Sequence, residues 1–205
     1  GGLIIATLVI NASLRYKKNK KAAFKQANSE YTHLPDENSL IIPKGLYFDK
    51  THTWAFLEEN GIVKVGVDDF LQHITGPLTR VKMGKKGKIV KRGDHILSVI
   101  QNGKQLNLYA PVSGTIIEQN KDLETNSSLI NSSPYNSGWI YKIDPTNWHR
   151  ENQLLFMAGK QREFLKTEYS RLKDFLAVVL NDDSEKYSQV ILQDGGEIRD
   201  GTLWA

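Results

Sequence analysis

The chain has 205 residues, of which 40% are hydrophobic and 24% are charged, and its formal net charge is +4. This composition is typical of a folded protein, and the length allows one well-cored domain with extensions. Because the chain contains no cysteine, disulfides, thiolate metal sites and cysteine nucleophiles are excluded. The excess positive charge is confined to two blocks, so we expect no general nucleic-acid-binding surface.

Residues 1–30 predict a membrane-anchor end followed by a basic helix. The apolar run at 3–10 is shorter than the roughly 20 residues that span a bilayer. Basic residues follow it at once, as they do on the cytoplasmic side of a transmembrane helix. A buried helix or strand is the alternative, and a signal peptide fits less well because its basic residues precede the apolar core. The first basic block consists of Arg15, Lys17, Lys18, Lys20, Lys21 and Lys25. We therefore expect a membrane protein whose soluble domain lies on the cytoplasmic side.

Residues 31–45, which contain Pro35, Pro43 and Gly45, are typical of a linker. From 46 to 144 the pattern changes to short strands separated by glycine-containing turns, which indicates an all-β sandwich or barrel. We expect strands at 46–48, 53–57, 62–67, 78–82, 88–90, 95–100, 115–118 and 138–143. A short helix is expected at 68–74, with Asp68 as its N-cap. Asp68 and Asp69 could instead form an acid–base pair, but carboxylates at a helix start favour capping.

The segment around Asn102-Gly103 predicts a tight β-hairpin. An Asn-Gly pair between two strand-like runs is the strongest short-range hairpin signal, because both turn residues need a positive φ. The run from Leu108 to Gly114 then leads into the next strand.

The tail at 145–205 has a different pattern. Apolar residues at steps of three and four between 151 and 180 predict an amphipathic helix or a helix pair, with Gly159 at the junction. A short hairpin is expected after residue 190. The apolar face of this tail must be covered either by the β domain or by a partner subunit.

Three motifs between 46 and 144 resemble the H protein of the glycine cleavage system. They are Asp49-Lys-Thr-His-Thr-Trp54, Val65-Gly-Val-Asp-Asp-Phe-Leu-Gln72 and Leu108-Tyr-Ala-Pro-Val-Ser-Gly114. Leu129-Ile-Asn131, Pro134-Tyr135 and Gly138-Trp139 also fit the pattern of that family. The resemblance implies a mainly β fold, a barrel-sandwich hybrid of the lipoyl/biotinyl type. To it this chain adds an N-terminal, transmembrane helix and a C-terminal helical extension.

The resemblance also implies where a cofactor would be attached. In the family, lipoate is carried by a lysine at a hairpin tip, inside a Glu-Ser-x-Lys-Ala segment just before the third motif. Counting back from Tyr109 without a gap puts Gly103 at the lysine position and Ile100 at the glutamate position. Lys104 lies one residue further on, and a shift of one residue along a strand turns every side chain to the opposite face. We therefore expect no cofactor, with lipoate on Lys104 as the alternative.

The other candidate residues favour structural roles. The five histidines, His33, His52, His73, His95 and His149, show no metal-ligand spacing, and His52 is expected to make a structural hydrogen bond beside Trp54. Trp54, Trp139 and Trp148 are expected in packing contacts. The second basic block is Arg80, Lys82, Lys85, Lys86, Lys88, Lys91 and Arg92. It is either a solvated face or a contact to anionic lipid or an acidic partner.

The sequence thus favours a non-catalytic, membrane-anchored, H-protein-like module for interaction or assembly, with protein partners and no enzymatic activity. It could equally serve as a subunit of a larger membrane complex. The alternative is a working lipoyl carrier of the glycine-cleavage type that uses Lys104.

Overall fold

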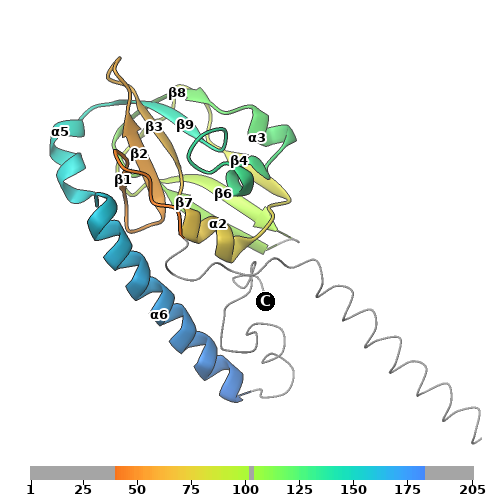
Figure 1. Ribbon diagram of the computed structural model, residues 1–205. Helices are drawn as coiled ribbons and strands as arrows, with labels where there is room; N and C mark the ends of the chain where they lie inside the picture. Colours follow the sequence, from red (N-terminus) through yellow and green to blue (C-terminus); the bar gives the residue numbers. More distant parts are fainter. Residues whose placement is uncertain (1–39, 102–103, 183–205) are drawn as a thin grey trace, which may run out of the picture. The chain divides into compact units, whose positions relative to one another are not determined.

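The computed structural model describes residues 40–101 and 104–182, which all belong to one compact unit, Leu34–Ala205 (Figure 1). The strands are β1 (Tyr47–Phe48), β2 (Thr53–Leu57), β3 (Val63–Val67), β4 (Arg80–Met83), β5 (Ile89–Val90), β6 (His95–Gln101), β7 (Lys104–Tyr109), β8 (Gly114–Gln119) and β9 (Tyr141–Pro145). The helices are α2 (Asp69–Thr75), α3 (Asp122–Thr125), α4 (Leu129–Ser132), α5 (Trp148–Glu151), the 3-10 helix η1 (Asn152–Leu154) and α6 (Ala158–Asp182). The predictions for residues 1–30, for Asn102-Gly103 and for the hairpin after residue 190 lie outside the described residues.

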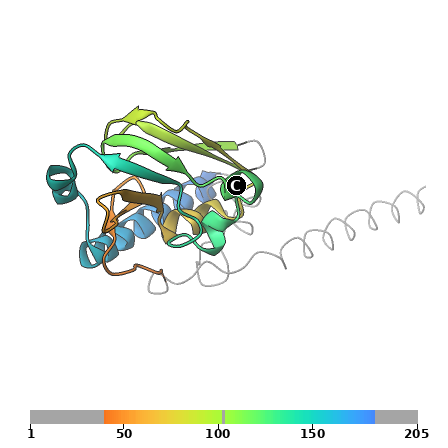
Figure 2. The same cartoon turned by 90° about the horizontal axis from the view of Figure 1, so that it is seen from above.

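Two antiparallel sheets make up the domain, so the prediction of a mainly β fold is confirmed. The larger sheet has the strand order β1-β2-β3-β9-β8-β5, and the smaller has the order β4-β6-β7. Strands that are neighbours in the chain pair as hairpins in β1-β2-β3 and β6-β7. Figure 2 shows the smaller sheet, in yellow-green, as a layer above α2 and the blue α6.

The core lies between the two sheets. Leu97 and Val99 of the smaller sheet share one apolar cluster with Val65 and Ile143 of the larger one, and all four are at most 2% exposed. Burying side chains of this size contributes about 1.5–3 kcal/mol each.

Tyr141 links the two sheets by hydrogen bonds inside this core. Its hydroxyl donates to the carbonyl of Ile96 (2.8 Å) and accepts from the N–H of Gly84 (2.6 Å). Burial raises the pKa of Tyr141 to about 12, although the Gly84 N–H acts in the opposite direction. A buried hydroxyl with both partners in place fixes one sheet against the other.

Two motif glycines are required by close packing. A Cβ at Gly66 would lie 2.4 Å from Cζ2 of the buried Trp54, and a Cβ at Gly114 would lie 2.2 Å from the carbonyl oxygen of Asp144. Neither position has room for a methyl group, so the fold requires glycine at both.

Three sequence predictions need correction. The strand expected at 138–143 begins only at Tyr141, because Gly138 lies in the turn after α4 and donates its N–H to Ser133. Gly159 is the second residue of α6, so the break between η1 and α6 lies just before the position expected for it. Leu154, expected on the apolar face, is 59% exposed.

Among residues 40–101 and 104–182, the structure contains no helix with the length and hydropathy needed to cross a membrane.

Candidate functional site

The β6–β7 hairpin carries the candidate attachment residue. Its register pairs Gln101 with Lys104 and Ser98 with Asn107. Two residues therefore separate the paired strands in the sequence, as the Asn102-Gly103 pair predicts.

Lys104 is the first residue of β7 and is exposed. By strand alternation it lies on the side of Leu106 and Leu108, which point towards the core. Lys104 itself remains in solvent because it lies at the strand end, beyond the buried part of the sheet. Within a strand, a shift of one residue would turn a side chain to the opposite face. At the position of Lys104 such a shift does not bury the lysine side chain.

A polar network covers the outer face of the same hairpin. His95 Nε2 is 2.9 Å from Ser98 Oγ, and Ser98 donates to Oδ1 of Asn107 (2.9 Å). Gln105 donates to the same Asn107 oxygen (2.9 Å) and accepts from Lys82 of β4 (3.4 Å). This network was not predicted from the sequence, although a two-residue loop after Gln101 already places Ser98 opposite Asn107.

Glu151 of α5 binds the motif that runs from Leu108 to Gly114. Glu151 accepts two hydrogen bonds from Ser113, one from its N–H (2.7 Å) and one from its hydroxyl (2.5 Å). The Ser113 hydroxyl in turn accepts from the N–H of Arg92, whose guanidinium forms an ion pair with Asp49. Ser113 of the motif thus has a structural role, joining α5 to the turn before β6.

His52 belongs to a buried polar cluster with α2 and α6. Its Nδ1 is 3.0 Å from Oδ2 of Asp68. The backbone of His52 has a φ of 62°, which residues other than glycine rarely adopt. Asp68 also accepts from the N–H of Leu71 (2.9 Å) and from Nε2 of Gln161 in α6 (3.1 Å). The expected structural role of His52 and the capping role of Asp68 are therefore both present.

The cluster changes the proton affinity of His52. Burial lowers its pKa, but the charge and hydrogen bond of Asp68 outweigh burial and, with the charges of Glu168 and Asp49, raise the pKa above 6.5. The ring also stacks on Phe70 at a centroid distance of 5.0 Å. His52 is thus favoured in its charged form while it helps to hold α6.

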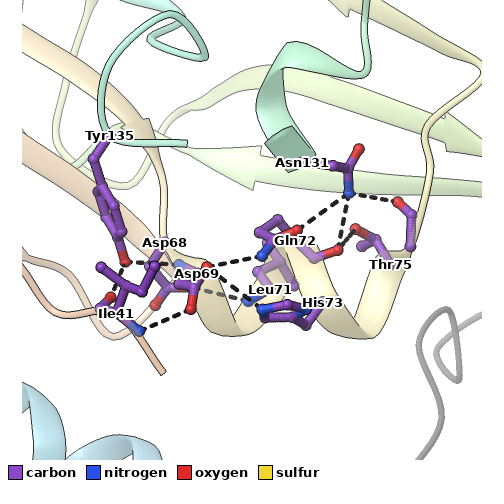
Figure 3. A network of polar contacts seen from close by, with 10 residues as sticks. Ile41, Asp68, Asp69, Leu71, Gln72, His73, Thr75, Asn131 and Tyr135 are labelled. Carbon is purple, nitrogen blue, oxygen red and sulfur yellow. Dashed lines mark hydrogen bonds and ion pairs between the residues drawn. The ribbon is translucent and has the colours of Figure 1, made fainter. Parts of the chain in front are cut away.

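Asp69 lies in a second network at the start of α2 (Figure 3). Its carboxylate accepts from the N–H of Ile41 and the amide of Gln72, both at 2.8 Å, and lies 3.5 Å from His73. Burial raises the pKa of Asp69, but these partners, His73 foremost, lower it overall. Asp68 caps α2, whereas Asp69 binds Ile41, Gln72 and His73, so the two carboxylates face different partners.

Tyr135 and Asn131 complete this network from the motifs that follow α3 (Figure 3). The Tyr135 hydroxyl accepts from the N–H of Asp69 (2.8 Å) and donates to the carbonyl of Ile41 (2.7 Å). Asn131 donates to the carbonyls of Gln72 (3.0 Å) and Gly76 (2.7 Å). These residues support the helix rather than bind a substrate.

The remaining candidates lie apart from the hairpin. Trp54 is buried and donates to the carbonyl of Pro134 (3.1 Å), while Trp148 packs edge-on against Tyr47. Trp139 lies beneath the ammonium of Lys142 at 5.4 Å. In the part of the chain that the structure describes, no group of three or more His, Asp or Glu side chains is placed to hold a metal ion.

Comparison with known proteins identifies similar chains. Residues 46–168 match the family model described as glycine cleavage H-protein. A "Probable glycine cleavage system H protein" of Pyrococcus horikoshii is 41% identical over 127 residues, which cover 62% of this chain and 93% of the relative. The H protein of Thermus thermophilus is 36% identical and covered over 98% of its length. The crystal structure of the H protein from Mycobacterium marinum superposes with a TM-score of 0.54 at 26% identity, over 62% of this chain and 98% of that one.

These matches contradict two sequence-based predictions. The interpretation as a non-catalytic interaction or assembly module in place of a carrier is wrong, because the chain matches relatives named glycine cleavage system H protein over 93% and 98% of their length. The expectation of no cofactor is wrong on the same ground, since the family is the one whose resemblance implies lipoate. That expectation came from counting back through the hairpin without a gap. It also assumed that a shift of one residue would turn Lys104 to a buried face, whereas Lys104 is exposed at the strand end.

Proposed function

Since the chain belongs to the glycine cleavage H-protein family, we propose that it is a lipoyl carrier of the glycine cleavage system, with Lys104 as the attachment residue. The observation that carries the proposal is the position of Lys104, which is exposed at the end of the β6–β7 hairpin where the two strands are connected. Lys104 is also the only lysine between residues 95 and 114, so no other amine lies in the hairpin or the motif after it.

A lipoyl arm on Lys104 would combine the chemistry of the cofactor with the position of the hairpin. The ε-amino group of Lys104 would form an amide with the carboxyl group of lipoate, beyond the core and within reach of a ligase. The bound lipoate would supply a disulfide that accepts a group and two electrons when it opens. The chain's own contribution is positional, since hydrogen bonds among Ser98, Asn107 and Gln105 join the two strands of the hairpin that carries the exposed residue Lys104.

The carrier role is consistent with a protein that has no catalytic activity of its own. Partner enzymes perform the chemistry and the carrier brings the arm to them, so protein partners from the glycine cleavage system are expected. In the ungapped count, Ile100, Gln101 and Gly103 stand where the family segment has glutamate, serine and lysine, and this is the main departure from that segment.

Replacement of the native H protein in a reconstituted glycine cleavage reaction tests the proposal. The full chain should restore glycine-dependent carbon dioxide release after incubation with lipoate, ATP and a lipoate–protein ligase. Lys104→Arg should abolish this activity, whereas Lys121→Arg, which changes an exposed lysine in α3's N-cap, should retain it. Equal activity of the two variants would contradict the assignment of Lys104.

We also propose that residues 1–14 attach the carrier to a membrane, with the β domain on the cytoplasmic side. The support is the apolar run followed by the first basic block. Deletion of residues 1–14 should remove the need for detergent during purification. If the full chain is recovered without detergent from the aqueous fraction, this attachment is wrong.

A further inference from the structure

The segment from β4 to just after β5 carries a positive surface. Its exposed cations lie on β4 and on the connections that flank β5, and we call them the basic face: Arg80, Lys82, Lys85, Lys86, Lys88 and Lys91. In the described part of the chain, none of these six side chains forms an ion pair with a carboxylate.

The sequence around the basic face offers almost no negative charge. Asp94 is the only acidic residue between 77 and 117, and its carboxylate accepts from the backbone N–H of Lys91 (2.8 Å). Arg92, the remaining cation of the block, pairs with Asp49. Six like charges therefore remain close together and repel one another until an outside anion approaches.

Strand register aligns these charges with the candidate arm. Arg80 is paired with Ile100 near the hairpin end of the sheet, and Lys82 is paired with Ser98 further along. Lys88 reaches the other end, where its ammonium donates to the carbonyl of His95 (3.3 Å). The basic face thus begins on β4, in the same sheet as Lys104, and continues along the chain past β5, which belongs to the larger sheet.

An enzyme surface fits this face better than a membrane. The described side chains around the face are largely polar, and its large exposed apolar neighbours are Ile89 of β5, 75% exposed, and Tyr109 of β7, 39% exposed. The Ser98–Asn107–Gln105 network beside it consists of hydrogen-bonded polar side chains, which do not insert into lipid. A membrane on this sheet would also shield the hairpin end from any enzyme, whereas an enzyme docked there would have the arm beside its active site.

We propose that the basic face is a docking surface for the carboxylate-lined rim of a glycine-cleavage enzyme that receives the arm. The role given to Lys104 rests on the proposed function, but the docking itself depends only on the charges of the face. Long-range attraction between such surfaces speeds encounter and selects the partner, and it weakens as salt increases.

The test uses the full, unlipoylated chain and the other glycine-cleavage enzymes of the same organism, each immobilised for biolayer interferometry. The variant Lys85→Glu/Lys86→Glu/Lys88→Glu reverses half of the basic face. The matched control, Lys50→Glu/Lys121→Glu/Lys160→Glu, makes the same change of net charge at three exposed lysines elsewhere. Both are compared with the parent chain at about 20 and 200 mM NaCl, where the Debye length falls from roughly 20 to 7 Å.

The expected result is binding to at least one enzyme that weakens about tenfold or more in the first variant and less than about threefold in the control. Higher salt should weaken the binding of the parent chain to the enzyme and should leave the binding of the first variant nearly unchanged. Equal loss in the two variants, or binding of the first variant as tight as that of the parent, would overturn the proposal. So would binding of the parent only to phosphatidylglycerol vesicles and to none of the enzymes.

The readout separates this inference from the carrier function. Absence of lipoate on Lys104 with charge-dependent docking would contradict the proposed function alone. Lipoate on Lys104 without charge-dependent docking would contradict the basic face alone.

Discussion

Gln161 of α6 donates a hydrogen bond to Oδ2 of Asp68 at 3.1 Å, joining residues 93 positions apart in the chain. Both side chains are fully buried, and Asp68 is also the N-cap of α2. This contact attaches the long helix to the β domain through the same carboxylate that holds His52. The helix and the domain should therefore unfold together.

Gln161→Ala should lower the free energy of unfolding by about 1–3 kcal/mol, because it removes the donor to Asp68 and leaves a cavity. Urea denaturation followed by circular dichroism measures the change. The neighbouring Arg162→Ala, which alters an exposed side chain, should stay within about 0.5 kcal/mol of the parent chain. Similar losses in both variants would show that Gln161 does not attach the helix.

The stability of the domain should fall as the pH rises above neutrality. The pKa of His52 is raised in the folded state, so the folded chain holds this proton more tightly than the unfolded chain. The resulting stabilisation is complete below the unfolded value of 6.5 and is lost as the pH rises through the folded-state pKa. The groups that face the ring are Asp68, Asp49 and, from α6, Glu168.

Urea unfolding of the parent chain and of His52→Gln, measured from about pH 5.5 to 8.5, tests this pH dependence. The difference in stability between the two should be largest at the acidic end and should shrink towards the alkaline end. A difference that stays constant over the range would contradict the linkage to His52.

Gly66→Ala should destabilise the chain by about 1–3 kcal/mol, because the new methyl group would overlap the buried ring of Trp54. Gly159→Ala is the matched control, since no atom lies within 4 Å of the position that its methyl group would take and the residue is helical. The control should leave stability unchanged or raise it by up to about 1 kcal/mol. Thermal denaturation of the two variants gives the comparison, and equal melting temperatures would argue against the close contact.

Much of the fold is predictable from local signals. Asp68 before an apolar turn predicts the start of α2, and the Asn-Gly pair predicts the register of β6 with β7. The sheet order is not predictable in this way, because the pairings of β3 with β9 and of β8 with β5 join distant segments. The late start of β9 likewise depends on the packing of Gly138 against the carbonyl of Leu129, a contact that no local pattern records.

The candidate site shows a different limit. The sequence places Lys104 one position from the expected lysine, and that shift looks disqualifying because within a strand it would turn the side chain to the other face. The structure places Lys104 at the strand end, where it is exposed. Sequence spacing alone does not distinguish these two situations, whereas the extent of the buried sheet does.

The position of the lysine can itself be varied. Gly103→Lys provides a lysine where the ungapped count expects one, and Gly103→Lys/Lys104→Arg provides it there alone. If Lys104 is the natural site, the parent chain should accept lipoate at a rate within about tenfold of the double variant, a difference of about 1.4 kcal/mol in activation free energy. Modification of the double variant with none of the parent would place the acceptor at residue 103 and would contradict the use of Lys104.

The most direct measurement is the mass of the peptide that contains Lys104, taken from the chain purified from its native host. We expect this peptide to carry the mass increment of one lipoyl group, and fragmentation to place the increment on Lys104. An unmodified peptide, from cells whose other lipoyl proteins are fully modified, would contradict the central claim.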